Sequence, residues 1–588
     1  MINSYKEDEK SVDKPKIVTI ARLLKYLFEY KGRIFIVLLL MGFGTCVQLI
    51  NPLFFEAAVD KYIMPKDLHG FIRLIILAAV LNLGLVLAIK LRMLLMAKTS
   101  NQVILKIREQ LYTHIQTLDL NFFDSRPIGK ILARITGDVN SLRDIMENCV
   151  TTLIPELITV IAVGVIMFTK NWRLALASLF SLPPMMLGIW IISKKSHNYW
   201  QVFRKKQSNM SAFVNEDFSG IKIVHSFNAQ KETNATFRSI IGEYRGAFVK
   251  AVRWSDAYWS VIDLCWSLGT MAMYYVGIKV IGVTDVSIGT YIAFGTYIGM
   301  FWQPIMNLSQ FYNQLVTTVS GAERVFEILD TKAKLVDKEN AVEMPQIKGN
   351  VKFDNVTFSY TGKENVLENV NFDIVAGKTV ALVGPTGAGK STIVNLISRF
   401  YDVNEGAVLI DGYDIRDVTI KSLRTQMGVM TQDNFIFSGT IKDNIRYGKL
   451  DATEEEIIAA AKVVHAHEFI EKMEKGYDTE LTSRGGELSK GQGKLVAFAR
   501  TMLSDPRILI LDEATSSIDT KTEQLIQKGI AALLKGRTSF VIAHRLSTIQ
   551  NADIIFVVDE KNILEAGTHE ELLAKKGKYW KLVEDAKA

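Results

Sequence analysis

Six apolar runs, each long enough to cross a lipid bilayer, fill most of the first half of the chain and limit what it can fold into. They cover residues 34–55, 71–91, 149–169, 174–193, 258–281 and 290–308. About 20 helical residues span the roughly 30 Å hydrocarbon core of a bilayer. Only residues 170–173 separate the third run from the fourth, and only residues 282–289 separate the fifth from the sixth, so each pair is predicted to form a tight hairpin. The sequence therefore predicts an all-α transmembrane domain with six spanning helices.

The composition of the whole chain fits a membrane part joined to a soluble part. Of the 588 residues, 48% are hydrophobic and 22% are charged. The first value is high for a purely soluble protein, and the second is high for a purely membrane-embedded one. A chain of this length also exceeds one ordinary domain. The net charge of +7 does not by itself indicate nucleic acid, because Lys and Arg concentrate in the cytoplasmic loops of membrane proteins.

The N-terminal region and the cysteines argue against two other classes of protein. Residues 1–16 form a polar tail without the apolar core of a cleavable signal peptide. Residues 17–30 then show helical apolar spacing with a basic edge, which predicts a helix lying at the membrane surface. The cysteines (Cys46, Cys149 and Cys265) lie in apolar stretches without metal-ligand spacing, so neither a disulfide framework nor a metal site is expected from them.

The charge of the loops predicts the orientation in the cell membrane. The segment 98–145 carries seven Lys and Arg residues and the segment 194–253 carries eleven, whereas the loops on the opposite side carry four in total. By the positive-inside rule, we expect the N-terminus, both long loops and the C-terminal half to be cytoplasmic.

Both long loops are predicted to be helical hairpins that extend the spans into the cytoplasm. An apolar face repeats every three or four residues through Ile104, Ile107, Leu111, Ile115 and Leu118. The first loop is expected to turn at 122–129 and the second near 211–220. Legs of about 22 residues reach about 33 Å, far enough to touch a cytosolic domain. The alternative is a soluble insertion with its own core, for which the loops contain few clustered aromatic and β-branched residues.

Two carboxylic acids lie within the predicted spans. Glu156 and Asp263 should face the interior of the helix bundle, because charge in contact with lipid is costly. Each could contact a cation or the substrate, or could instead make hydrogen bonds between helices. Aromatic residues along spans five and six would suit an aromatic amphipathic substrate, but interfacial aromatic belts give the same pattern.

From about Gly349 onward, short strands alternate with helices, which predicts an α/β domain at 350–588 after a polar linker at 321–349. The strand predicted at 379–383 leads into a phosphate-binding loop of the form G-x-x-x-x-G-K-[ST]. The loop comprises Gly384, Pro385, Thr386, Gly387, Ala388, Gly389, Lys390, Ser391 and Thr392. The glycines turn backbone N–H groups toward one anion, Lys390 adds a positive charge for the outer phosphates, and Ser391 would hold Mg²⁺. We therefore expect this domain to bind a nucleotide with Mg²⁺.

With these motifs in place, residues 17–585 resemble an ABC exporter half-transporter, in particular one chain of a heterodimeric bacterial multidrug exporter. The resemblance implies a transmembrane domain at 17–320 fused ahead of a P-loop ATPase domain. It also assigns roles to single residues of the second half. Tyr360 would stack on adenine, Asp512 would associate with Mg²⁺, and Gln432 would reach both Mg²⁺ and the membrane domain.

The resemblance further implies the hydrolytic residues and the contacts between two chains. Glu513 would be the catalytic carboxylate that polarises the attacking water, and His544 would lie near the γ-phosphate. Asp519 would lie in a loop that crosses the dimer interface. The signature motif, which closes the ATP site of a second chain, would be Ser489, Lys490, Gly491 and Gln492.

The signature departs from the family pattern at two positions. Lys490 replaces the usual third-position glycine, and Gly493 stands where arginine is common. Glycine permits close approach to the γ-phosphate, whereas lysine adds bulk and charge. Because Glu513 is retained, we expect a heterodimer whose second chain carries a consensus signature, with one hydrolytic and one degenerate site. The alternative is a homodimer that tolerates Lys490.

The resemblance implies ATP-driven export of amphipathic small molecules by alternating access, in contact with membrane lipids. Alternatives are a lipid flippase of the same architecture and an ATP-gated membrane channel or regulator. A soluble P-loop ATPase acting on nucleic acid does not fit six spans and a signature motif, so no nucleic-acid partner is expected.

Overall fold

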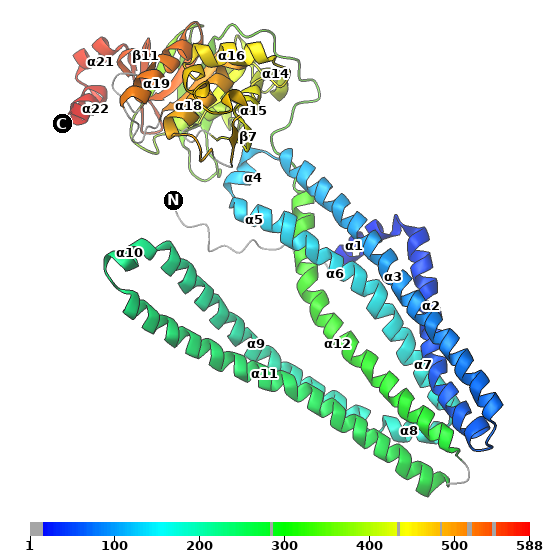
Figure 1. The fold of residues 1–588 in the computed structure, drawn as a ribbon. Coiled ribbons are helices and arrows are strands. Elements are labelled where there is room, and N and C mark those ends of the chain that lie inside the picture. Colours follow the sequence, from blue (N-terminus) through cyan, green and yellow to red (C-terminus); the bar gives the residue numbers. More distant parts are fainter. Residues whose placement is uncertain are drawn as a thin grey trace. The chain divides into compact units, whose positions relative to one another are not determined.

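The computed structural model describes residues 16–282, 286–431, 435–482, 485–513, 520–543 and 549–587. The chain divides into two compact units (Figure 1). We call the first, Met1–Ile115 with Gly129–Asp330, the helical unit. The second, Gln116–Ile128 with Thr331–Ala588, is called the α/β unit. The structure agrees with the expected fold class, since a part built of long helices is followed by an α/β part.

The helical unit consists of long helices joined by short loops. Several of the helices are extended by a π-helical segment. Its main helices are α1 (Lys16–Phe28), α2 (Lys31–Ala57), α3 (Leu68–Gln116), α5 (Ile128–Ala133), α6 (Val139–Asn148), α7 (Ile154–Lys170), α8 (Trp172–Leu179), α9 (Leu182–Ser219), α10 (Ile221–Ser226), α11 (Gln230–Tyr275) and α12 (Ile288–Asp330). The apolar face of α1 packs on the end of α12, where the Tyr26 and Phe326 rings stack and Arg22 pairs with Asp330 at 2.7 Å.

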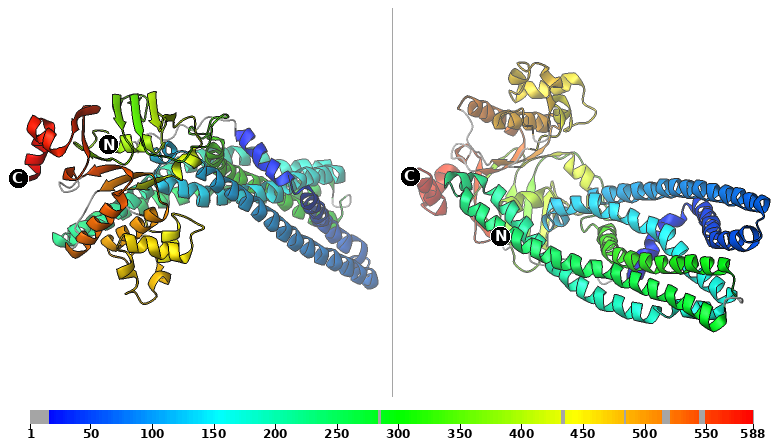
Figure 2. Two further views of the ribbon diagram at one scale, coloured as in Figure 1. Left: turned by 90° about the horizontal axis from the view of Figure 1, so that it is seen from above. Right: turned by 60° about the horizontal axis from the view of Figure 1, so that its bottom comes forward.

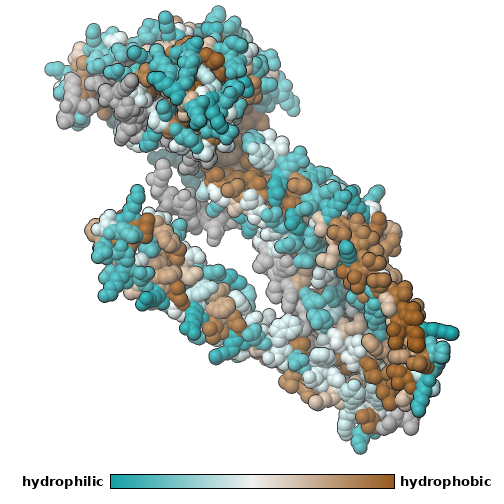
Figure 3. All heavy atoms as spheres, in the orientation of Figure 1, coloured by the Kyte–Doolittle hydropathy of each residue, from teal (hydrophilic) through white to brown (hydrophobic). Residues whose placement is uncertain are grey.

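Five helical segments among the described residues are long and apolar enough to cross a membrane, and they contain the first five predicted spans. They are Lys31–Ile63, Leu68–Gln116, Ile128–Lys170, Trp172–Ser219 and Gln230–Ile281. The sixth predicted span lies within α12, which is helical throughout but carries polar residues such as Thr296, Gln303 and Asn307. Exposed apolar side chains gather over α2 and α3 (Figure 3), for example Phe35, Leu39, Ile76, Leu83 and Leu87, as expected for a lipid-facing surface.

The two long loops are helical hairpins, as predicted, but the turn of the second is misplaced in the prediction. Residues 211–219 continue α9 without a break to its last residue, Ser219, and Gly220 caps the helix. The turn is made by α10 and the residues up to Ala229. Polar residues at 211–219 read as a loop in the sequence, yet they are solvent-exposed helix positions. Figure 1 shows α9 and α11 packed side by side and diverging from the other helices toward α10.

The two carboxylic acids predicted to face the interior differ in environment. Glu156 accepts a hydrogen bond from Nδ2 of Asn307 at 2.5 Å, which joins α7 to α12. Asp263, by contrast, is exposed on α11 in the single chain. An interior position within this chain is therefore found for Glu156 alone.

The α/β unit is built on three sheets in its described part. The first has the order β2 (Leu367–Ile374), β1 (Val351–Phe358), β4 (Glu405–Ile410), β5 (Tyr413–Asp414) and is antiparallel. The second has the order β12 (Asn562–Gly567), β11 (Ile554–Asp559), β3 (Thr379–Val383), β10 (Thr538–Ala543), β9 (Ile508–Glu513), β6 (Met427–Met430) and is parallel except for β12. The third pairs β7 (Gly439–Thr440) with β8 (Glu480–Leu481).

Two layers cover the faces of the six-stranded sheet. The helices of this unit are α4 (Leu120–Asp124), α13 (Lys390–Ile397), α14 (Ile420–Arg424), α15 (Ile441–Arg446), α16 (Glu454–Val463), α17 (His467–Ile470), α18 (Lys490–Leu503), α19 (Thr520–Leu534), α21 (His569–Lys575) and α22 (Lys578–Lys587). Along β3, Val380 and Leu382 pack with α13 and the first sheet, whereas Ala381 and Val383 pack with α15, α16 and α18. In Figure 2 the green antiparallel strands and the yellow helices accordingly lie on opposite sides of the orange strands.

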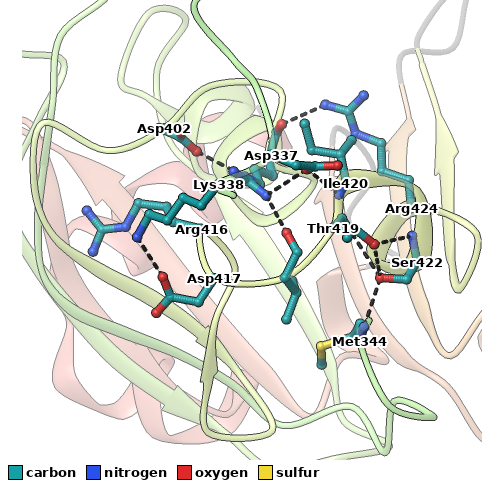
Figure 4. Close-up of polar contacts among 12 residues, drawn as sticks. Asp337, Lys338, Met344, Asp402, Arg416, Asp417, Thr419, Ile420, Ser422 and Arg424 are labelled. Atoms are coloured by element: carbon teal, nitrogen blue, oxygen red, sulfur yellow. Dashed lines mark hydrogen bonds and ion pairs between the residues drawn. The ribbon is translucent and has the colours of Figure 1, made fainter. Parts of the chain in front are cut away.

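The segment after α12 is fastened along the surface of the α/β unit (Figure 4). Oδ1 of Asp337 accepts a hydrogen bond from Ile420 N at 2.8 Å and lies 3.7 Å from Nη1 of Arg399. Arg399 is only 1% exposed, and Nη1 also donates to the Val418 carbonyl at 2.7 Å. Lys338 pairs with Asp417 at 2.6 Å. Residues 337–350 of the predicted linker are therefore held against the α/β unit, and we call this segment the strap.

The C-terminal end of this strap is held by one carboxylate. Asp411 accepts hydrogen bonds from the backbone N–H groups of Lys348, Gly349 and Asn350 and from the Asn350 amide. Burial alone would raise the pKa of Asp411, but these donors together hold it below the ordinary value.

Replacing Asp411 should destabilise the α/β unit in a pH-dependent way. A carboxylate with a lowered pKa stabilises the fold above its unfolded pKa of about 3.9, and this stabilisation is lost as the pH falls through the folded value. We expect Asp411→Asn to cost about 1–3 kcal/mol near pH 7. The difference in melting temperature between wild type and variant should shrink as the pH falls below about 4. A difference that stays constant down to pH 3 would contradict this role.

Candidate ATP site

The phosphate loop connects the end of β3 to the start of α13 and depends on glycine at its ends. Gly384, Gly387 and Gly389 have φ angles of 144°, 87° and 104°, which L side chains rarely adopt. A Cβ atom on Gly384 would lie 2.1 Å from the Val558 carbonyl oxygen of the neighbouring strand β11. The loop is thus fixed by the sheet against which it packs.

Lys390 points back into the loop that precedes it. Its Nζ donates to the carbonyl oxygens of Gly384 and Pro385, each at 2.8 Å, and the residue is only 7% exposed. Burial lowers the pKa of Lys390, and the nearby Asp512 carboxylate partly offsets this effect. A buried ammonium group inside a glycine loop at a helix start is the arrangement that binds phosphate chains.

An aromatic cluster lies beside the same helix. The Tyr360 hydroxyl is 3.1 Å from Oγ1 of Thr392, in the first turn of α13. The Tyr360 ring meets the rings of Phe358 and Tyr401 edge-on, at 4.8 and 5.0 Å between centroids. Tyr360 keeps 37% of its surface exposed, so it can offer a face to a purine base.

The tyrosine that supports this cluster also contacts α4. The Tyr401 hydroxyl donates to Oδ2 of Asp124, the last residue of α4. Burial and this carboxylate both raise the pKa of Tyr401, so the phenol remains a donor. At the other end of α4, Asp119 caps the helix and accepts a hydrogen bond from Lys334 N at 2.7 Å. The turn of the first long loop is therefore fixed to the α/β unit next to Tyr360.

The order and register of the central sheet bring several predicted residues to one edge. The parallel strands β3, β10 and β9 are adjacent, with Leu382 opposite Ile542 and Ile542 opposite Asp512. The next residue of β9, Glu513, is opposite Ala543, where β10 ends. Asp512 and Glu513 are therefore positioned by a rigid strand at the same sheet edge as the phosphate loop.

Three predicted residues lie outside the described residues. These are His544, Gln432 and Asp519. The strands that end shortly before the first two are described: β10 ends at Ala543 and β6 at Met430. Their predicted roles remain predictions.

The signature residues open α18. Ser489 caps this helix by accepting a hydrogen bond from Gln492 N at 3.2 Å, while Oε1 of Gln492 accepts one from Ser489 N at 2.9 Å. Lys490 is the first residue of the helix and is exposed, and Gly491 is buried. The capping box fixes the backbone of the motif without using the lysine side chain.

The phosphate loop and the signature belong to opposite faces of the sheet. Residues of α13, such as Ile393 and Leu396, pack in the core on the side of the first sheet. Residues of α18, such as Leu495 and Phe498, pack in the core on the other side. One chain thus presents two separate half-sites, as expected if each is completed by another chain.

The side chains near the phosphate loop can supply ligands for Mg²⁺ bound with ATP. Mg²⁺ is usually held by a few protein oxygen atoms together with oxygen atoms of the phosphates. Ser391 is exposed at the start of α13, and Asp512 lies close enough to Lys390 to affect its pKa. Among the residues that the structure describes, Ser391 and Asp512 are therefore the candidates for holding Mg²⁺.

Comparison with known proteins places both halves in one family. The profile of the ABC transporter transmembrane region matches residues 34–305, and the ABC transporter profile matches residues 367–516. The chain is 40% identical to the uncharacterized ABC transporter ATP-binding protein YknV of Bacillus subtilis, over 98% of this chain and 96% of that protein. It is 38% identical to an ATP-dependent lipid A-core flippase of Syntrophus aciditrophicus, over 83% of this chain and 81% of that protein.

The solved structures lead to the same family. A bacterial Atm1-family ABC exporter with ATP bound superposes with a TM-score of 0.77 at 30% identity. The match covers 95% of this chain and 98% of that chain. The domain at 367–516 therefore binds ATP.

Tyr401 and Asp124 are site residues that the sequence did not reveal. Both belong to local patterns without special chemistry, and they are 277 positions apart. The turn at 122–129 was predicted to reach a cytosolic domain, but nothing in its sequence names the residue that it meets.

Removing the Tyr401 hydroxyl should weaken the link between α4 and the aromatic cluster while leaving the ring in place. Tyr401→Phe should keep ATP affinity within about twofold, because the edge-on contact with Tyr360 remains. Loss of one hydrogen bond to a charged group should lower ATPase activity in the membrane by about fivefold, or about 1 kcal/mol. Asp124→Asn should have a similar effect. Unchanged ATP turnover in both variants would show that the contact between α4 and Tyr401 does not affect hydrolysis.

Proposed function

The chain belongs to the ABC transporter family, with the membrane region and the ATPase region joined in one polypeptide, and we propose that it is one half of a dimeric exporter of amphipathic small molecules. As a family member it spans the membrane and couples ATP hydrolysis to transport. The proposed location is the cell membrane, with the α/β unit in the cytoplasm. The excess of Lys and Arg in the two long loops supports this orientation.

The observation that carries the proposal is the position of α4. This helix joins α3 to α5 in the chain, yet it folds with the α/β unit and bonds to Tyr401 beside the aromatic cluster. A change at the ATP site would therefore act on a helix that short turns connect to α3 and α5. Such a connection suits ATP-driven alternating access better than a soluble ATPase.

The proposed chemistry uses the sheet edge described above. When bound, Mg²⁺ would neutralise phosphate charge, with Ser391, Asp512 and Gln432 as its protein partners. Lys390 would hold the outer phosphates and Tyr360 the adenine. Glu513 would polarise the attacking water, and His544 would stabilise the charge that develops on the γ-phosphate.

We further propose that the second half-transporter is a different chain with a consensus signature. Lys490 is the first residue of α18, where its bulk and charge would face the partner's ATP in the family arrangement. A cation at a helix N-terminus is also unfavourable with the helix dipole. The site closed by this signature would hold ATP, while the site containing Glu513 would hydrolyse it.

The principal alternative cargo is a lipid. The similarity to a lipid A-core flippase favours it specifically. An ATP-gated channel would instead pass its cargo down a gradient without hydrolysis. Uptake into inside-out vesicles separates these cases, because a pump accumulates its cargo only while ATP is hydrolysed.

Glu513→Gln tests the hydrolytic assignment. The amide keeps the size of the side chain but cannot act as a base, so we expect ATP binding to persist and turnover to fall by about 100-fold or more. Nucleotide binding and phosphate release, measured on the purified complex, distinguish the two effects. Undiminished hydrolysis would mean that another carboxylate activates the water.

Purification of the tagged chain from its native host tests the heterodimer. We expect a second, different half-transporter chain to be recovered in equal amount, and the pair to have ATPase activity. Recovery of this chain alone, with full ATPase activity, would instead establish a homodimer that tolerates Lys490.

A further inference from the structure

A polar cavity lies among the membrane helices of the helical unit. Helices α2, α3, α7 and α12, with Thr151 just before α7, enclose a volume of about 280 Å³. Its walls combine apolar side chains such as Leu85 and Met300 with polar ones. The polar lining residues are Thr45, Gln48, Arg92, Thr151, Glu156, Thr159 and Gln303. Polar and charged groups inside a membrane are costly, so a cavity that gathers several of them is a candidate binding site.

The positively charged residue that lines this cavity is Arg92. It follows directly on the apolar run 71–91 of α3, and its Nε atom is buried without a hydrogen-bond partner. Within the part of the chain that the structure describes, no hydrogen bond or ion pair engages its guanidinium group. Arg92 as a whole is partly buried, so its guanidinium group can meet a ligand in the cavity. A bound anion would offset the cost of the buried, unpaired Nε–H group.

The acid that lines the same cavity does not serve as that anion. Glu156 is engaged by Asn307, which in turn accepts a hydrogen bond from Gln303 at 3.2 Å. No ion pair within 4 Å joins Glu156 to Arg92 among the described residues. On the α7–α12 side of the cavity, Glu156, Asn307 and Gln303 are therefore linked to one another, and Arg92 on α3 is not part of this chain of hydrogen bonds.

We propose that this cavity binds the acidic head group of an amphipathic cargo, with Arg92 pairing to a carboxylate or phosphate. The planar guanidinium offers forked N–H donors that match both groups. Pockets for whole drug-sized ligands measure about 300–1,000 Å³, so this cavity suits a head group whose apolar part lies elsewhere. The inference rests on the proposed export of amphipathic molecules and narrows their class to acids.

The test compares matched probes on the full transporter complex in lipid nanodiscs. Dodecanoate and dodecyl phosphate carry the acidic group, and dodecanol carries the same chain without it. We expect the two acids to stimulate ATPase activity at concentrations at least about tenfold lower than dodecanol, as a charge-assisted pair predicts. Stimulation by only one acid would identify carboxylate or phosphate as the preferred source.

Arg92→Gln should remove the preference for acids, and Arg92→Lys should restore part of it. Lys90→Gln is the matched control, because Lys90 lies two residues away on the same helix and is exposed. Should Arg92→Gln fail to fold, Gln48→Glu places a competing carboxylate in the cavity lining and should raise the concentration of acid needed, with little effect on dodecanol.

Equal responses to acids and alcohol in the wild type, or an acid preference that survives Arg92→Gln and Gln48→Glu, would overturn the head-group site. The proposed export function would still stand in that case, provided that amphiphiles stimulate hydrolysis. If neither acids nor alcohol stimulate hydrolysis or are transported, the failure lies with the proposed function itself.

Discussion

The hydrogen bond from Tyr401 to Asp124 is the interaction on which the account of coupling depends. It holds α4 against the aromatic cluster that contains Tyr360, although α4 belongs in sequence to the loop between two membrane helices. A short turn joins α4 to α3, which is one unbroken helix of 49 residues from Leu68 to Gln116, so a displacement of α4 would be passed to that helix. The partly buried Tyr401 phenol donates to a carboxylate at a helix end, which makes a directional link that ATP binding would bias.

A second constraint is the separation of the phosphate loop from the signature of the same chain. Its helix α13 and the signature helix α18 pack on opposite faces of the six-stranded sheet. The capping box of Ser489 and Gln492 keeps the signature backbone in shape, so Lys490 would alter the surface offered to a partner chain rather than the fold. This distinction explains how a chain could retain a sound ATP loop and a stable signature helix while forming one weak hydrolytic site.

Features encoded within short stretches of sequence were predicted, whereas contacts between residues far apart in the sequence were not. Glycine spacing and a strand before it defined the phosphate loop, and apolar runs of bilayer length defined five spans, because both signals lie within short stretches. The turn of the second loop was predicted near 211–220 but lies at 220–229, since exposed polar positions of a helix resemble a loop. Neither the contact of Arg399 with Asp337 nor that of Tyr401 with Asp124 could be predicted, because single-chain periodicity carries no information on pairs so far apart.

Disulfide cross-linking tests most directly whether the phosphate loop is completed by another chain. Thr386 and Ser489 are both exposed and can each be replaced by cysteine in a background without Cys46, Cys149 and Cys265. With Thr386→Cys in this chain and a cysteine at the signature serine of the second chain, ATP should produce a disulfide that joins the two chains. A disulfide formed within one chain between Thr386→Cys and Ser489→Cys would contradict the account.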